Sequence, residues 1–151
     1  MRKQAGFTLL ELMVVMAIIG LMMGVVSFNA MPSERQQLQR EAERIALLLQ
    51  SARDEAIVRN RQIMFEAEGQ SYHFRMRDNG QWVAIPRDDL LKDRAFERPN
   101  IRLTMQPAPQ DGSSRIIFGR EPVDKPFVLT LSSGEVFAAI HADGIGHFSV
   151  E

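Results

Sequence analysis

Residues 7–28 read FTLLELMVVMAIIGLMMGVVSF, and this run decides how the rest of the chain is organised. Seventeen of its 22 side chains are apolar, and it carries a single charge, Glu11. At ~1.5 Å per residue a helix of this length is about 33 Å long, enough to cross a hydrocarbon core of roughly 30 Å. The run therefore predicts a transmembrane helix, which we place at residues 7–31.

A cleaved secretory signal is the alternative interpretation of this segment. The apolar part of such a signal is usually ~7–15 residues long, which is shorter than the run found here. Cleavage after Ala30 would also put the bulky Phe28 at a position that requires a small residue. We therefore expect the helix to remain attached to the chain.

The carboxylate of Glu11 lies one helical turn inside the apolar run. An unpaired charge in the hydrocarbon costs at least a few kcal/mol, so Glu11 needs either a partner or a shallow, hydrated position at the headgroup boundary. Gly20 and Gly24 form a small-xxx-small pattern, which lets neighbouring helices approach closely. These three residues are the candidates for helix-to-helix contacts.

The rest of the chain has the composition of one ordinary globular domain. Of 151 residues 45% are hydrophobic, 18 are Lys or Arg, 19 are Asp or Glu, and none is Cys. Beyond residue 32 there are 16 basic and 18 acidic side chains, which predicts no general attraction to nucleic acid or anionic lipid. Collagen-like, disordered and disulfide-rich classes are excluded, and so is cysteine chemistry.

A second helix, amphipathic, is predicted over residues 32–61. Pro32 interrupts the apolar helix, and Ser33 and Gln36 supply a capping pattern for a new one. One apolar stripe steps by four and three residues, and charged residues occupy the opposite face. A coiled-coil partner is the alternative, but strand-like sequence follows after about three heptads, so we favour packing against the chain's own sheet. The stripe is Leu38, Ala42, Ile45, Leu49, Ala52 and Ala56, and the charged face carries Arg40, Glu43, Asp54 and Arg59.

From Ile63 the periodicity changes to that of strands, which predicts an antiparallel β-domain over residues 62–151. Tyr72, Phe74 and Met76 alternate with polar residues, and Asp78-Asn79-Gly80 is a hairpin turn before Trp82–Ile85. The fold class is therefore α+β, a long helix packed on an antiparallel β-domain. Further strands are expected at Ile101–Met105, Arg115–Phe118, Phe127–Leu131, Glu135–His141 and Ile145–Val150.

No motif in the sequence predicts catalysis, a cofactor or a metal site. A phosphate-binding loop, a nucleophile elbow and a cysteine nucleophile are all absent from the sequence. A two-residue turn at Asp143-Gly144 would put His141 and His147 on opposite faces, whereas a three-residue turn would bring them to one face as potential metal ligands. His73 is expected to face solvent, and the mixed charges of residues 87–102 are expected to form a solvated loop.

The first eleven residues supply a specific resemblance. Arg2-Lys3-Gln4-Ala5-Gly6-Phe7-Thr8-Leu9-Leu10-Glu11 resembles the class III signal of type IV prepilins and pseudopilins: a basic leader ending in Gly, then Phe, then Glu at the fifth mature position. The resemblance implies that residues 1–6 are a leader, that a prepilin peptidase cuts between Gly6 and Phe7, and that the amino group of Phe7 is methylated. It also implies that Glu11 pairs with the N-terminus of a neighbouring subunit and sets the axial register.

The resemblance extends to the minor pseudopilin H family of the type II secretion system, which shares its domain with minor type IV pilins. It implies a type IV pilin-like fold and a tip position in a periplasmic pseudopilus that supports export of folded proteins across the outer membrane. The implied partners are minor pseudopilins I, J and K, major pseudopilin G, the prepilin peptidase and the inner-membrane assembly platform. The segments that carry it are Ser51–Ile57, Gly80–Trp82, Ile116–Phe118 and Pro126–Leu131.

Orientation in the membrane follows from the resemblance alone, because Arg2 and Lys3 precede the apolar run while Arg35 and Arg40 follow it. The family implies a single-pass protein of the inner membrane, with its N-terminus in the cytoplasm and its β-domain in the periplasm. The alternative is a minor type IV pilin acting in pilus assembly or DNA uptake. A DNA-binding pilin would be expected to present a stronger basic patch than this sequence offers.

Overall fold

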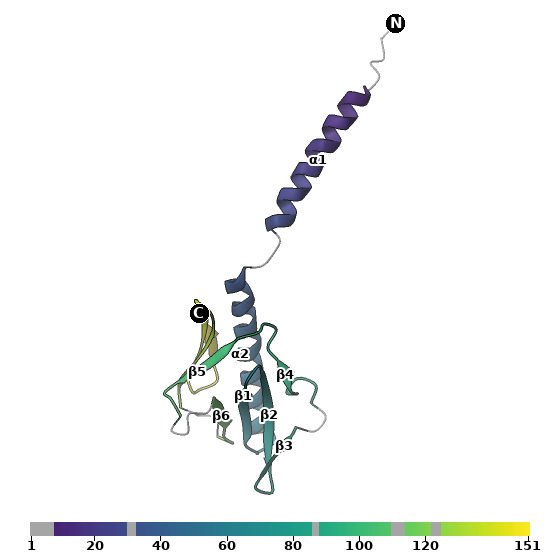
Figure 1. The fold of residues 1–151 in the computed structure, drawn as a ribbon. Helices are drawn as coiled ribbons and strands as arrows, with labels where there is room; N and C mark the ends of the chain where they lie inside the picture. The colour runs from purple at the N-terminus through teal and green to yellow at the C-terminus, as the bar shows by residue number, and fades with distance from the viewer. Residues whose placement is uncertain (1–7, 30–32, 86–87, 110–113, 122–124) are drawn as a thin grey trace. The chain divides into compact units, whose positions relative to one another are not determined.

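The computed structural model describes residues 8–29, 33–85, 88–109, 114–121 and 125–151, with the backbone alone for residues 24–29. The chain divides into two compact units, Met1–Ser33 and Glu34–Glu151. The first unit contains helix α1 (Leu9–Asn29), and the second contains helix α2 and all the strands (Figure 1).

Helix α1 is apolar around its whole circumference. In the described part of the unit its large side chains are exposed, with exposed fractions between 42% at Ile19 and 78% at Leu9. Among the residues that the structure describes, no helix has the combined length and apolarity needed to cross a membrane. The predicted span over residues 7–31 stays a prediction.

Helix α2 (Glu34–Val58) buries the predicted apolar stripe, whose six members are at most 1% exposed. The helix ends at Val58, and Asn60 just beyond it adopts a left-handed φ of 52°. Asn60 N–H donates to the Ile57 oxygen and Arg61 N–H to the Ala56 oxygen, at 3.1 and 3.0 Å. This pattern satisfies the last carbonyl groups of the helix and releases the chain toward the first strand.

The first sheet has the strand order β3–β2–β1–β6, with the short β4 also paired to β2. Tyr72, Phe74 and Met76 of β2 point to the core, as their alternation predicted. Asn79 and Gly80 have φ values of 47° and 83°, which suit the tight hairpin turn predicted there. The strands are β1 (Ile63–Glu68), β2 (Ser71–Asp78), β3 (Gln81–Ala84), β4 (Arg94–Ala95) and β6 (Arg115–Phe118).

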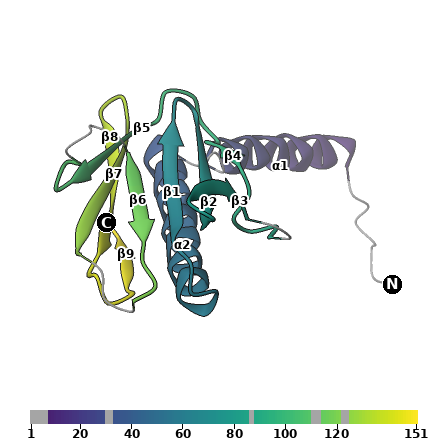
Figure 2. The ribbon, with the colours of Figure 1, turned by 90° about the horizontal axis from the view of Figure 1, so that it is seen from below.

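The second sheet has the order β5–β7–β8–β9 and is antiparallel throughout. Figures 1 and 2 show it beside the first sheet, with β6 on the side of the first sheet that faces it. Leu129, Leu131 and Ile140 on its inner face are fully buried. The strands are β5 (Arg102–Gln106), β7 (Phe127–Ser133), β8 (Val136–Ala142) and β9 (Phe148–Val150).

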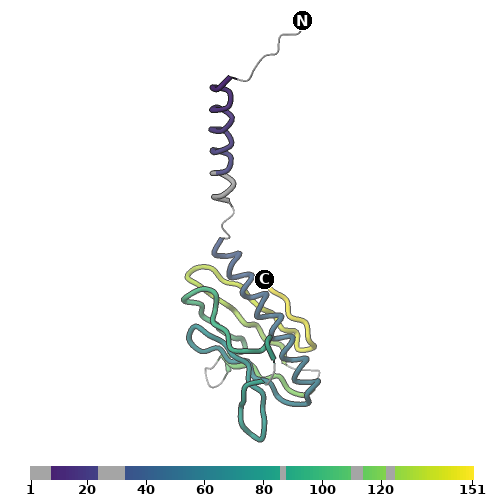
Figure 3. The backbone as a smooth tube through the Cα atoms, turned by 90° about the vertical axis from the view of Figure 1, so that its right-hand side faces the viewer, coloured from purple at the N-terminus to yellow at the C-terminus, as the bar shows by residue number. Residues whose placement is uncertain are grey.

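Helix α2 covers one side of both sheets and joins them into one core (Figure 3). It contacts β1 and β6 of the first sheet and β7, β8 and β9 of the second. The core combines the apolar stripe of α2 with aromatic side chains of the first sheet and aliphatic side chains of the second. The predicted α+β fold is thereby confirmed.

The predicted turn between the last two strands is wrong. The connection spans residues 143–147 instead of two residues, so β9 begins at Phe148 and His141 pairs with Ser149. The reason is Asp143, whose Oδ1 accepts the backbone N–H groups of Ile145, Gly146 and His147 at 2.8–3.1 Å. The Asp143 carboxylate thus satisfies backbone N–H groups that have no strand partner, and so stabilises a longer loop.

Candidate functional site

The N-terminus of α1 is organised by Thr8 and Glu11. The Glu11 N–H lies 3.3 Å from Thr8 Oγ1 and 3.1 Å from the Thr8 oxygen, so Thr8 is the N-cap of the helix. Glu11 is thus in the first turn, where the partial positive charge of the helix N-terminus favours a carboxylate. The capping pattern Thr8-x-x-Glu11 was present in the sequence, but sequence reasoning missed it.

The predicted helix-contact residues have open surroundings where they are described. Glu11 is exposed, and a Cβ added at Gly20 would meet nothing within 4 Å. The surroundings of Gly24 lie outside the described residues, as do the predicted cleavage-site residues Gly6 and Phe7. Within the described part of this unit, α1 therefore offers Glu11 and an apolar surface to whatever covers it.

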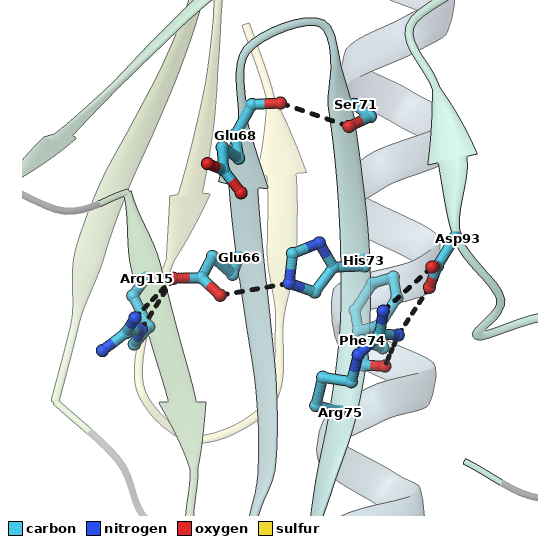
Figure 4. Close-up of polar contacts among 8 residues, drawn as sticks. All are labelled: Glu66, Glu68, Ser71, His73, Phe74, Arg75, Asp93 and Arg115. Carbon is cyan, nitrogen blue, oxygen red and sulfur yellow. Dashed lines mark hydrogen bonds and ion pairs between the residues drawn. The ribbon is translucent and has the colours of Figure 1, made fainter. Parts of the chain in front are cut away.

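A polar row crosses the face of the first sheet that points away from the core (Figure 4). Glu66 on β1 accepts from Arg115 Nε on β6 at 3.0 Å and lies 3.0 Å from His73 Nε2 on β2. The Arg115 guanidinium holds the pKa of Glu66 below its ordinary value, with His73 contributing in the same direction. His73 lies on the outer face, as its alternation with Tyr72 and Phe74 predicted, and its contact with Glu66 leaves it half-buried there.

The mixed-charge loop that follows β3 is exposed and is tied to the domain by ion pairs. Asp93 accepts from Arg75 Nη2 of β2 at 2.9 Å, and this guanidinium lowers the pKa of Asp93 (Figure 4). Further along, Glu97 lies 2.6 Å from Arg44, and Arg98 lies 2.7 Å from Glu34. The loop is largely exposed, as predicted, and the structure adds surface ion pairs that join its charges to β2 and α2.

One carboxylate of α2 is buried beneath this loop. Glu41 is 3% exposed, and Arg44 Nη2 donates to both of its oxygens at 2.6 and 2.8 Å. Burial raises the pKa of Glu41, although the adjacent guanidinium opposes the shift. Arg44 also contacts Glu97, so the guanidinium that neutralises Glu41 links the helix to the loop.

A second charged residue of α2 holds the loop between β8 and β9. Arg53 is 9% exposed, and its Nη2 donates to the Ile145 oxygen at 3.1 Å. Its guanidinium occupies the place where a side chain at Gly146 would begin, because a Cβ there would lie 2.6 Å from Arg53 Nη1. Sequence reasoning missed Arg53, since no local pattern indicates a contact 92 residues away.

The two histidines considered as metal ligands have separate partners. His147 Nδ1 lies 2.8 Å from Asp143 Oδ2, and His141 Nε2 lies 3.7 Å from Glu151 Oε2. Asp143 is partly desolvated, but the N–H groups of its loop and His147 outweigh that effect and lower its pKa to about 2. In the described part of the chain, no group of three or more acidic or histidine side chains is placed to hold a metal ion.

Two family models match the chain. Residues 1–27 match the prokaryotic N-terminal methylation motif, and residues 41–144 match the type II transport protein GspH. The second match covers more than half of the 151 residues. The chain belongs to the GspH family.

A relative that matches most of the chain agrees with this membership. The type II secretion system protein H of Pseudomonas aeruginosa is 35% identical over 139 residues, which cover 90% of this chain and 80% of the relative. Together with the methylation motif, GspH membership supports a minor pseudopilin role for the chain. It also indicates a membrane-anchored periplasmic protein with partners in the pseudopilus.

Solved structures show the same fold. The minor pseudopilin EpsH of Vibrio cholerae superimposes with a TM-score of 0.62 at 12% identity, over 79% of this chain and 98% of that one. The type IV minor pilin FimU of Pseudomonas aeruginosa gives a TM-score of 0.57 at 18% identity, over 78% of this chain and 90% of that one. This chain thus shares the fold of both solved structures.

Proposed function

We propose that this chain is a minor pseudopilin at the tip of the type II secretion pseudopilus, where it supports export of folded proteins across the outer membrane. The observation that carries the proposal is the combination of a GspH-family domain with an apolar helix that bears one carboxylate, Glu11, in its first turn. In this account the protein works by assembly and not by catalysis, and it needs no cofactor.

Processing is the first proposed step. A prepilin peptidase cleaves between Gly6 and Phe7 and methylates the new amino group of Phe7, in line with the match to the methylation motif. Glycine before the cut leaves the backbone accessible to the peptidase, and cleavage after residue 6 leaves the apolar helix attached. That helix anchors the protein in the inner membrane as a single pass, with the N-terminus in the cytoplasm and the domain in the periplasm.

Glu11 then selects the register of assembly. A carboxylate without a counter-charge is costly in lipid, whereas the N-terminal amine of a neighbouring subunit neutralises it when the helices stack in register. A misregistered neighbour leaves Glu11 unpaired. The open surface at Gly20 allows close approach of the neighbouring helix, and Gly24 extends the same small-residue pattern in the sequence.

The proposed partners are the minor pseudopilins I, J and K and the major pseudopilin G. The inner-membrane assembly platform would feed the processed chain into the growing filament. In the cell, this subunit would couple filament growth to the passage of folded proteins through the outer-membrane channel.

A minor type IV pilin is the second candidate function, because the FimU structure has the same fold. The two functions share the stem and differ in the filament that the subunit enters. A strain that lacks the gene separates them. Loss of secreted enzymes from the culture medium with surface pili intact supports the pseudopilin function, whereas normal secretion with defective pili or DNA uptake would refute it.

A further inference from the structure

The free edge of the second sheet carries unpaired backbone groups. Strand β9 is the last in the order β5–β7–β8–β9, so within the described residues β8 is its one pairing partner. Glu151 exchanges two hydrogen bonds with Ala139, both at 2.9 Å. Hydrogen-bonded pairs alternate along an antiparallel ladder, so the N–H and C=O groups of Phe148 and Val150 point away from β8.

An apolar groove lies between this edge and helix α2. Its volume is about 360 Å³, and it is lined by Glu43, Ala46, Leu47, Gln50, Phe148 and Val150. Leu47 is 66% exposed, although the other leucines of α2 are buried. Unpaired backbone beside apolar side chains is the arrangement that binds an extended polypeptide by adding a strand to a sheet.

Strand β9 has only three residues, yet it is held firmly at its start. Asp143 fixes the preceding loop, and Arg53 ties that loop to α2 through the Ile145 oxygen. The Phe148 ring packs 6.3 Å from the rings of both Phe118 and Phe127. The edge is therefore preorganised, and a bound segment would not have to bear the entropic cost of ordering it.

The charge around the groove specifies the chemistry of the segment. Among the described residues that line it, Glu43 is the one charged side chain. Glu151 directly follows β9, and its side chain is 79% exposed, with His141 at 3.7 Å. Carboxylates on both sides of the strand are complementary to Lys or Arg.

We propose that β9 accepts an extended segment of a different pseudopilus subunit as an added strand. On the side of the segment that faces α2, apolar residues cover Leu47 and Phe148, and a Lys or Arg residue meets Glu43. The inference rests on the proposed function, because it names the surface through which the subunit meets a neighbour in the pseudopilus.

Photocrosslinking in secreting cells tests the proposal on the full chain. A photoreactive residue replaces Leu47, and a control chain carries it at Leu90, which is comparably exposed at 60% but lies on the loop after β3. We expect Leu47 to give at least fivefold more adduct to another pseudopilin than Leu90. Peptide mapping should place the adduct in a segment that carries apolar residues and a Lys or Arg. Adducts to a second copy of this chain alone, or equal yields at the two positions, would overturn the proposal.

Two matched variants test the backbone and the charge separately. Val150→Pro removes the outward N–H of β9 and leaves the pairing of Glu151 with Ala139. Its control, Val150→Ala, also removes the valine side chain but keeps the N–H. The proline variant should lower the Leu47 adduct at least fivefold below the alanine variant. Glu43 is exposed, so its substitution should leave the fold intact. Glu43→Lys should lower the yield of the Leu47 adduct at least threefold below Glu43→Gln, which tests the proposal even if the proline variant fails to fold. Unchanged yields in both pairs would contradict the inference.

A secretion assay separates failure of this inference from failure of the proposed function. If gene deletion abolishes secretion while a folded Val150→Pro chain secretes normally, the pseudopilin function stands and the edge-strand surface is refuted. If gene deletion leaves secretion normal, the proposed function itself is wrong.

Discussion

Arg53 on α2 donates a hydrogen bond to the backbone oxygen of Ile145, 92 residues away, at 3.1 Å. This contact joins the helix to the loop between β8 and β9, and the absence of a side chain at Gly146 makes room for the guanidinium. The start of the last strand is therefore set by a long-range contact from the helix as well as by its own loop.

Gly146→Ala should destabilise the domain by about 3 kcal/mol, at the upper end of the cost of a strained backbone position. Gly146 has φ = 114°, which disfavours any side chain, and the added Cβ would displace Arg53. Urea unfolding of the full chain in detergent, followed by circular dichroism, measures the loss. The control is Gly134→Ala, with φ = 60° and open surroundings, which should cost only about 1 kcal/mol. Equal losses at the two positions would contradict this account of the contact.

The loop between β8 and β9 should titrate at unusually low pH. The folded-state pKa of Asp143 is about 2 against an ordinary 3.8, so its ionised form stabilises the native state above pH 4. That contribution falls as pH drops from about 4 through 2. The carboxyl carbon signal of Asp143 in an NMR titration should have its midpoint near 2. Asp143→Asn should remove this part of the pH dependence of unfolding, and a midpoint near 4 would refute the loop geometry.

Truncation of two leucines of α2 should change the free energy of unfolding by very different amounts. Leu49 is fully buried in the core, so Leu49→Ala should cost about 2–5 kcal/mol of unfolding free energy. Leu47→Ala, two residues earlier, should change it by less than about 0.5 kcal/mol because Leu47 is exposed. Denaturant unfolding of both variants measures the difference. Similar losses would mean that the helix packs on a different face.

Replacing Glu11 should separate insertion from assembly. Glu11→Gln removes the charge but keeps the size, so the chain should insert and be cleaved normally while its incorporation into pseudopili falls at least tenfold. Glu11→Asp keeps the carboxylate and should retain most of the incorporation. Fractionation of membranes and sheared filaments measures both steps. Normal incorporation of the glutamine variant would rule out a register role for Glu11.

The local parts of the fold could be predicted because each depends on neighbouring residues. The spacing of Leu38, Ile45 and Leu49 predicted the buried face of α2, and Asn79-Gly80 predicted the hairpin turn between β2 and β3. Strand order was not predictable, because alternation shows which face a strand buries but not its neighbour. The division into two sheets under one helix therefore emerged only from the structure.

Side-chain contacts between distant or looped residues were the part of the structure that the sequence did not predict. Asp143 lengthens a loop that looked like a short turn. The outer-face position of His73 was predicted, but its contact with Glu66 on the next strand was not. Asp93 accepts a hydrogen bond from Arg75, 18 residues earlier, and this contact ties the charge-rich loop to β2. Of the candidate site, the position of Glu11 in the first helical turn was predictable, whereas the groove beside β9 depends on tertiary packing.

The most direct test of the central claim is to locate the chain in isolated pseudopili. Immunogold labelling of filaments sheared from cells that carry an epitope-tagged chain shows where the subunit lies and how often it occurs. A minor tip subunit should label one end of each pseudopilus with few particles. Labelling along the whole filament, or labelling of surface type IV pili instead, would contradict the proposed function.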